Sequence, residues 1–130
     1  MSAAQRLDEV FGLPRGSAVI VLNDPETKVP IAIMDGTLIS AIRTGAVTGV
    51  CAKYMAPSRS KTVGLFGACP QCKTQLMALK ASLPQLEKAY VYDLSRERAE
   101  KFAAEMSQKL NMDVQAASDR LARSKAATSL

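Results

Sequence analysis

The sequence predicts an α/β protein whose second half is a parallel sheet with helices packed against it. Three observations support this class. A short apolar run at 62–66 leads into a turn at Gly67 and then into a helical pattern that begins at Pro70. A second apolar run at 89–93 and a weaker one at 113–117 follow, each after a stretch long enough for one helix. Strands and helices that alternate at this spacing are typical of parallel βαβ units.

The first half is expected to hold a β-hairpin followed by one helix. Apolar and β-branched residues fill 17–22 and 30–34, and the polar segment 23–27 between them has turn chemistry. From Thr37 onward, apolar residues recur at helical spacing to about Ala56. The Pro- and Ser-containing segment that follows is interpreted as a domain boundary.

The predicted domains are therefore 1–57, which contains the hairpin and one helix, and 58–130, half of a nucleotide-binding domain. In the second domain, a helix is expected from Pro70 to about Ser82. Ser95 is the expected N-cap of a further helix, which Asn111 should stop. A last helix is predicted at 119–128. The inward face of the helix after Ser95 is expected to consist of Ala99, Phe102, Ala103, Met106 and Leu110.

The turn at Gly67 has the layout of a dinucleotide-binding site of the Rossmann type. A strand runs through a glycine into a helix whose N-terminus favours an anion. Asp93 ends the next strand, at an offset close to the ~20 residues at which this fold places a ribose-binding carboxylate. Cys69 departs from the pattern, because a second glycine is expected there so that the backbone can approach a pyrophosphate.

The same turn supports a different hypothesis. Cys69, Pro70, Gln71 and Cys72 form a C-x-x-C motif between a strand and a helix, which is the layout of a thiol-redox site. Thiol-disulfide oxidoreductase activity is thus one alternative function, although redox folds place this motif after their first strand. A catalytically inactive fragment with a structural or interaction role is another.

Composition excludes several classes of site and partner. The net charge of +5 comes from scattered basic residues without aromatic clusters, which argues against nucleic acid. The absence of histidine excludes a Cys/His zinc site and a Ser-His pair, so no metal is expected. Three cysteines and no leader pattern favour the cytoplasm. No apolar run approaches the ~18 residues of a membrane span.

Several segments resemble the ornithine cyclodeaminase/mu-crystallin family. They are the turn at 23–27, the segment 34–37 (Met-Asp-Gly-Thr), the helical segment 43–46 (Arg-Thr-Gly-Ala), and the turn that carries Gly67 and Gln71. The resemblance runs from about residue 12 to about residue 118. Two positions depart from the family pattern: Cys69 replaces the usual second glycine, and Cys72 replaces a small residue.

The resemblance implies that 1–57 is a partial substrate-binding and dimerisation domain and that 58–130 is a partial NAD-binding domain. It also implies roles for individual residues. Arg43 would bind the carboxylate of an amino-acid substrate and lie near the cofactor, which suits the planar guanidinium. Gln71, with Pro70, would contact the pyrophosphate through the main chain. Asp93 would accept hydrogen bonds from the ribose and favour NAD over NADP. The cofactor-binding positions implied are Arg43, Thr44, Gly67, Cys69, Pro70, Gln71 and Asp93.

The activity implied is that of an NAD-dependent ornithine cyclodeaminase, an ammonia-lyase that converts L-ornithine into L-proline and ammonia, or of a related oxidoreductase of cyclic imines or amino acids. The expected partners are a small amino-acid substrate and a second copy of the chain in a dimer. Family proteins are longer at both ends, so the chain is expected to be an internal fragment. Their C-terminal half supplies the acid-base aspartate, so no catalytic residue is assigned, and the isolated chain is expected to be inactive.

Overall fold

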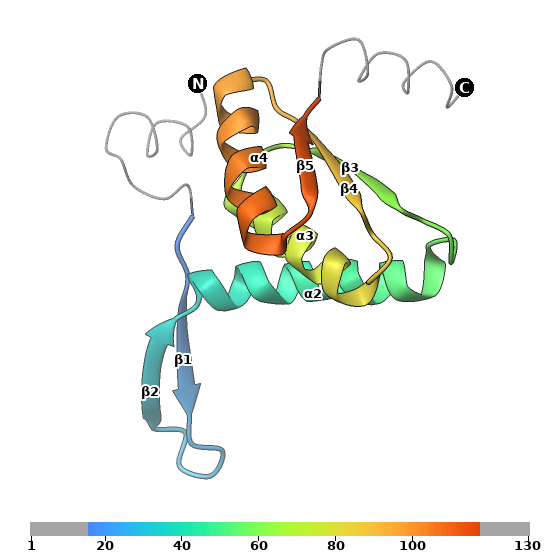
Figure 1. The fold of residues 1–130 in the computed structure, drawn as a ribbon. Coiled ribbons are helices and arrows are strands. Elements are labelled where there is room, and N and C mark those ends of the chain that lie inside the picture. The colour runs from blue at the N-terminus through green and yellow to red at the C-terminus, as the bar shows by residue number, and fades with distance from the viewer. Residues whose placement is uncertain (1–15, 118–130) are drawn as a thin grey trace, which may run out of the picture. The chain divides into compact units, whose positions relative to one another are not determined.

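A computed structural model describes residues 16–117, and the predicted helix at 119–128 lies outside this part (Figure 1). The described residues fall into two compact units that divide between Ala41 and Ile42. We call residues 16–41 the hairpin unit and residues 42–117 the sheet unit. The expected domain boundary after residue 57 concerns the two functional halves of the protein and stays a prediction.

The hairpin unit contains the predicted antiparallel pair, β1 (Val19–Asn23) and β2 (Pro30–Asp35). The turn between the strands is closed by Asp24, whose carboxylate accepts hydrogen bonds from the amides of Glu26 at 3.0 Å and Thr27 at 2.7 Å. A short polar side chain that bonds to the backbone two and three residues later is what turn-forming aspartates provide. The sequence-predicted hairpin is confirmed.

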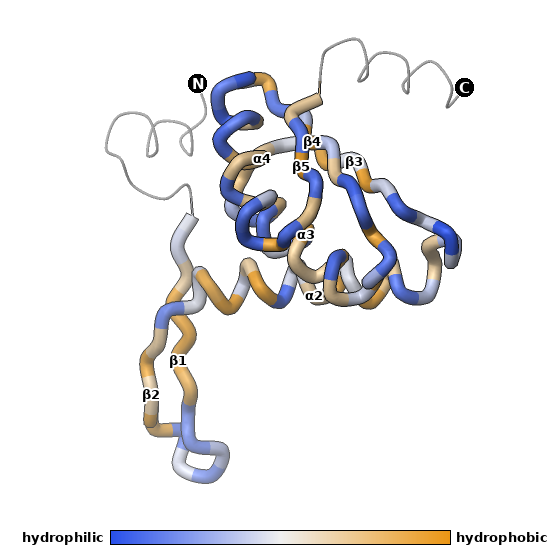
Figure 2. The backbone as a smooth tube through the Cα atoms, viewed as in Figure 1, coloured by the Kyte–Doolittle hydropathy of each residue, from blue (hydrophilic) through white to orange (hydrophobic). Residues whose placement is uncertain are grey.

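The apolar side chains of this hairpin are mostly exposed. Ile33 is 73% exposed and Val19 is 69% exposed, and Figure 2 shows hydrophobic residues along both strands. Within the described part of the hairpin unit, Gly36 is the one buried residue. The hairpin therefore has strand composition without a core of its own.

Helix α2 (Thr37–Met55) follows β2 and spans the division between the units. Its first turn is capped by Asp35, whose carboxylate accepts a hydrogen bond from the Thr37 amide at 2.9 Å. This bond satisfies one of the amides that a helix start leaves unpaired. The prediction of a helix from Thr37 is confirmed, with its end one residue before the expected Ala56.

The sheet unit has the predicted β-α-β-α-β order. Strands β3 (Thr62–Phe66), β4 (Lys88–Tyr92) and β5 (Asp113–Ala116) are parallel and lie in the order β3-β4-β5. Helix α3 (Pro70–Ser82) connects the first two strands, and α4 (Arg96–Leu110) connects the last two. The α/β fold class is confirmed, and β3 has a strand partner on one side only within the described residues.

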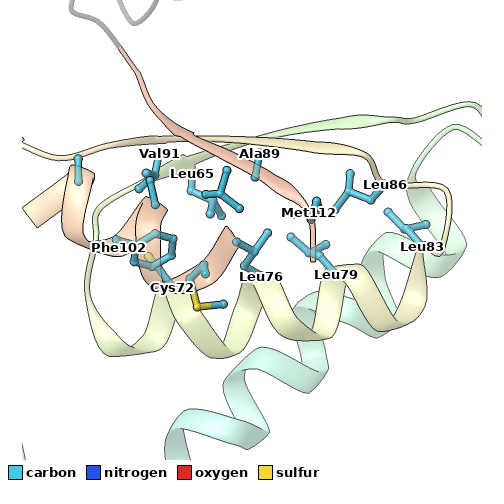
Figure 3. Close-up of a cluster of buried hydrophobic side chains, with 14 residues drawn as sticks. Leu65, Cys72, Leu76, Leu79, Leu83, Leu86, Ala89, Val91, Phe102 and Met112 are labelled. Atoms are coloured by element: carbon cyan, nitrogen blue, oxygen red, sulfur yellow. The ribbon is translucent and has the colours of Figure 1, made fainter. Parts of the chain in front are cut away.

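The core of the sheet unit lies between the sheet and these two helices. Figure 3 shows Leu76 and Leu79 of α3 directed toward Leu65 and Val91 of the sheet, with Phe102 of α4 beside them. Burial of apolar surface of this kind stabilises a fold by about 25 cal/mol per Å². The buried cluster comprises Leu65, Cys72, Leu76, Leu79, Leu83, Leu86, Ala89, Val91, Ala99, Phe102, Ala103, Met106, Met112 and Val114.

Both ends of α4 follow the sequence prediction. The Ser95 hydroxyl accepts a hydrogen bond from the Arg98 amide at 3.4 Å, which makes Ser95 the N-cap. Asn111 ends the helix in the left-handed conformation, with φ of 46°, a backbone state that asparagine tolerates better than most residues. Between 16 and 117, no helix combines the length and the apolar composition needed to cross a membrane.

Candidate functional site at the Gly67 turn

The turn after β3 depends on Gly67. Its φ is +103°, a region that residues with a side chain rarely adopt. Space is not the constraint, because a Cβ added at Gly67 would meet only the Cys72 sulfur, at 3.7 Å. The Gly67 amide donates a hydrogen bond to the carbonyl of Tyr92 at 2.6 Å and thereby ties the turn to the end of β4.

Asp93 fixes the same turn from the other strand. One carboxylate oxygen accepts a hydrogen bond from the Ala68 amide at 2.8 Å. The other accepts bonds from the Ser95 amide at 2.9 Å and from the Arg98 guanidinium at 3.0 Å. The Asp93 side chain is only 11% exposed. Burial alone would raise its pKa, but the bonds from Ser95, Ala68 and Arg98 outweigh burial and hold the pKa below its usual range.

These contacts give Asp93 a positioning role that the sequence reasoning did not assign. Asp93 was expected to accept hydrogen bonds from a ribose, and each carboxylate oxygen has several acceptor directions, so a ribose hydroxyl can still be accommodated. The bond to Ser95 follows from a recognisable signal, an aspartate two residues before an N-cap. The bond to Ala68 has no such signal, because it joins residues that are distant in sequence.

The N-terminus of α3 presents main-chain donors at this turn. Cys69 is the N-cap, in an extended conformation and without a side-chain hydrogen bond to the helix. Within residues 16–117, the amides of Cys69 and Gln71 have no hydrogen-bond partner. Pro70 has no amide hydrogen, so of the two residues expected to contact a pyrophosphate through the main chain, only Gln71 can donate. Pro70 instead supplies the backbone angle that suits the first helical position.

The two thiols of the C-x-x-C motif lie close together. The sulfur atoms of Cys69 and Cys72 are 3.6 Å apart. Cys69 is exposed, whereas Cys72 is buried in the core cluster. Burial, reinforced by the neighbouring Cys69, raises the pKa of the Cys72 thiol to about 11. The two cysteines of the motif therefore differ sharply in their access to solvent.

Helix α2 brings the Arg-Thr-Gly segment to the same place. The Thr44 hydroxyl accepts a hydrogen bond from the Gln71 side-chain amide at 3.4 Å. A Cβ on Gly45 would lie 2.7 Å from the carbonyl of Thr74, so only glycine lets α2 approach α3 this closely. Arg43 is exposed, and its guanidinium forms no hydrogen bond or ion pair with any residue of the described range.

The structure thus gathers most of the predicted site residues around one turn. Gly67, Cys69, Pro70 and Gln71 form the turn and the start of α3, and Asp93 closes it from β4. Thr44 reaches it from α2, with Arg43 next to it in sequence. In the described part of the chain, no three His, Cys, Asp or Glu side chains gather as a metal site would require.

The fold and the turn define the class of protein first: the sheet unit is an α/β fold of the Rossmann type, with a parallel sheet, a glycine turn and a helix that begins directly after that turn. Its family is equally clear. The model of the ornithine cyclodeaminase/mu-crystallin family matches residues 2–128, so the chain belongs to this family.

Three relatives illustrate the range of the family. The Δ1-pyrroline-2-carboxylate reductase of Thermococcus litoralis, whose structure contains NADH and L-proline, is 46% identical, with a TM-score of 0.80 over 85% of this chain and 34% of its own. An archaeal alanine dehydrogenase, a dimer with bound NAD, is 32% identical, with a TM-score of 0.77 over 86% of this chain and 34% of its own. The L-lysine cyclodeaminase of Streptomyces rapamycinicus is 36% identical over 76% of this chain and 29% of its own.

The chain spans about a third of the length of these relatives. Their names describe a reductase, a dehydrogenase and a cyclodeaminase, which are different reactions on small amino or imino acids. Members of this one family therefore carry out different reactions.

Proposed function

We propose that this chain contributes the nucleotide-binding half of an NAD-dependent enzyme that acts on a small amino acid or cyclic imine. The proposed activity is that of an ornithine cyclodeaminase or of a closely related imine or amino-acid oxidoreductase. The observation that carries this proposal is the Gly67 turn, with two unpaired amides at the start of α3, in a chain of this family. Relatives with NAD or NADH bound support the choice of cofactor.

The residues at the turn fit a dinucleotide. The amides of Cys69 and Gln71 would donate to the pyrophosphate, helped by the positive end of the α3 dipole. Thr44 would hold the Gln71 side chain against α2. Arg43 would bind the substrate carboxylate with its exposed guanidinium. NAD, when bound, would accept a hydride from the α-carbon of the substrate and return one in a cyclodeaminase.

Asp93 would determine which dinucleotide binds. Its carboxylate is ionised at neutral pH because its pKa is held low by the amides and the guanidinium around it. A second anion, such as the 2′-phosphate of NADP, would be repelled at this position. Arg98 is already paired with Asp93 and would compensate only by breaking that pair.

The complete reaction is proposed for the whole family-type enzyme rather than for this chain alone. No residue among 16–117 is assigned as the acid-base group. We expect no conversion of ornithine into proline by the 130-residue chain, and measurable proline formation with added NAD would contradict this expectation. By analogy with the dimeric relative, we propose that the chain assembles with a second copy, and that it works in the cytoplasm.

Calorimetric titration of NAD and NADP tests the proposal. Wild type is compared with Cys69→Gly, which restores the usual glycine, and with Cys69→Gly/Asp93→Asn, which removes the charge at the ribose position. Cys69→Gly should bind NAD about tenfold more tightly, a gain of about 1.4 kcal/mol. The added Asp93→Asn change should narrow the preference for NAD over NADP.

The ratio of NAD to NADP affinity is the decisive measurement, because a merely structural change at Asp93 would weaken both nucleotides alike. Equal NAD affinity in all three proteins would count against a nucleotide site. A disulfide-reduction assay on the same proteins covers the alternative function: thiol-disulfide oxidoreductase activity that disappears in Cys69→Gly would favour that alternative instead.

A further inference from the structure

The pair Cys69 and Cys72 has a geometry that nucleotide binding does not use. The sulfur atoms lie 3.6 Å apart, and a disulfide bond is about 2.05 Å long, so the sulfurs need to move by only about 1.5 Å to become bonded. Both belong to the first turn of α3, where the N-cap residue and the third helical residue face one another. The third cysteine of the chain, Cys51, is exposed on α2.

The two thiols differ in the way that a stepwise oxidation requires. Cys69 is exposed at the N-terminus of α3, where an oxidant can reach its sulfur. Cys72 is buried against the turn, with its sulfur 3.9 Å from the carbonyl oxygen of Phe66, and its pKa is raised to about 11. Cys69 is therefore the sulfur that reacts first, and Cys72 is the sheltered partner that closes the bond.

We propose that Cys69 and Cys72 form a redox-sensitive dithiol site, which closes to an intramolecular disulfide and lowers the affinity of the Gly67 turn for the nucleotide. The oxidant considered is glutathione disulfide. The Cys69 thiolate attacks one of its sulfurs, its S–S bond breaks, and one glutathione leaves. Cys72 then loses its proton and attacks the Cys69 sulfur, which expels the second glutathione. The protein gives up two electrons, and its two thiol protons end on the two glutathione molecules.

The effect on the nucleotide follows from the place of Cys69, and this step rests on the proposed function. In the dithiol form, the exposed Cys69 side chain is free to rotate, so it obstructs a pyrophosphate at the amides of Cys69 and Gln71 only in part. In the disulfide form, its sulfur is held over the first turn of α3, at the position where the dinucleotide-binding pattern has a glycine, and the obstruction is fixed. Oxidation should therefore weaken NAD binding by about tenfold, which corresponds to about 1.4 kcal/mol.

The test uses the full chain carrying Cys51→Ser, so that the remaining thiols are those of the pair. The protein is equilibrated in mixtures of reduced and oxidised glutathione, trapped with an alkylating reagent, and weighed by mass spectrometry. As the mixture becomes more oxidising, we expect protein with two alkylated cysteines to be replaced directly by protein with none, and no glutathione should remain attached. Dithiothreitol should restore the two alkylated cysteines. Cys72→Ala should instead retain one glutathione on Cys69.

NAD titration of the reduced and oxidised Cys51→Ser protein completes the test. Weaker binding by the oxidised form supports the proposal, and equal affinity of the two forms overturns the control of binding. The proposal of a dithiol site is overturned if both thiols stay reduced, or if glutathione remains attached to Cys69 in the protein that still has Cys72. If the reduced protein does not bind NAD, the proposed function and the control of binding both fail, while the alkylation result still decides whether the dithiol site exists.

Discussion

The two units of the chain use similar apolar strands and bury them very differently. In the hairpin unit, Ile33 is 73% exposed, whereas Val91 of the central strand of the sheet unit is fully buried. Both strands contain apolar side chains, so the presence of such side chains does not explain the difference in burial. The difference arises from helices α3 and α4, which pack against the sheet. Apolar alternation indicates a strand, but only neighbouring elements decide whether that strand is buried.

This difference in burial predicts that the two units differ in stability. The sheet unit has three strands and two helices around one continuous core, and three or more strands or packing against a helix are what an independently stable sheet needs. A two-stranded hairpin is marginal on its own in water. We therefore expect the hairpin to be the less stable of the two units, whereas the Gly67 turn belongs to a unit with its own core.

The largest expected effect is in the core of the sheet unit. Leu76 on α3 is fully buried, so Leu76→Ala should lower the free energy of unfolding by about 2–5 kcal/mol. The matched change in the hairpin is Ile33→Ala, which should cost less than about 0.5 kcal/mol because the side chain is mostly exposed. Urea unfolding followed by circular dichroism measures both. Similar losses for the two variants would show that Ile33 is covered in solution and would remove the contrast between the units.

Sequence reasoning predicted the elements well because their signals are local. The helical period from Thr37, the N-cap at Ser95 and the stop at Asn111 are patterns within a few residues, and all three were confirmed. The exposure of the hairpin could not be predicted, since it depends on what packs against it. The hydrogen bond between Ala68 and Asp93 at the turn could not be predicted either, because it joins residues that are distant in sequence.

At the candidate site too, the sequence predicted the local features but not the contacts between distant residues. The residues of the turn were named from their order along the chain, and the structure places them together. Gly45 was noted only as part of a motif, because its close approach to Thr74 is a property of two packed helices. Pro70 was expected to contact a pyrophosphate through its main chain, although proline has no amide hydrogen to donate. This restriction follows from the residue type and could have been recognised in the sequence.

The second largest effect concerns the charge of Asp93. Its folded-state pKa is lowered, so its contribution to stability is complete above the unfolded pKa of ~3.9 and is lost as the pH falls through the folded value. Asp93→Asn should remove about 1.5–3 kcal/mol at neutral pH, the range for hydrogen bonds to charged groups. It should also flatten the dependence of stability on pH between neutral and acid conditions.

The hairpin provides the comparison for Asp93. Asp24 also has a lowered pKa, chiefly through its bond from the Thr27 amide, but the hydrogen bonds of its carboxylate lie in an exposed turn. Asp24→Asn should therefore change the acid limb of the stability curve less than Asp93→Asn does. Urea midpoints measured from pH 7 to pH 3 decide the point, and an equal change in both variants would mean that burial at Asp93 has no energetic consequence.

A smaller effect is expected where α2 packs on α3. Gly45→Ala would place a Cβ 2.7 Å from the Thr74 carbonyl, and overpacking of this kind costs about 1–3 kcal/mol. Alanine regains up to about 1 kcal/mol of helix propensity, so the net loss should be about 1 kcal/mol. Gly64→Ala is the matched control, because a Cβ at Gly64 meets nothing within 4 Å. Equal stability of wild type and Gly45→Ala would contradict the close packing of the two helices.

The smallest expected effect is at the N-cap of α4. Ser95→Ala removes the hydroxyl that accepts the Arg98 amide at 3.4 Å, a long bond, so the loss should lie near the lower end of the range for N-caps, about 0.5 kcal/mol. Ser95→Asp keeps an acceptor at the helix N-terminus and should retain wild-type stability. Hydrogen exchange by residue measures where the loss appears. Faster exchange in α4 with unchanged exchange in the hairpin supports two independent units, whereas faster exchange in the hairpin as well would show that its order depends on the sheet unit.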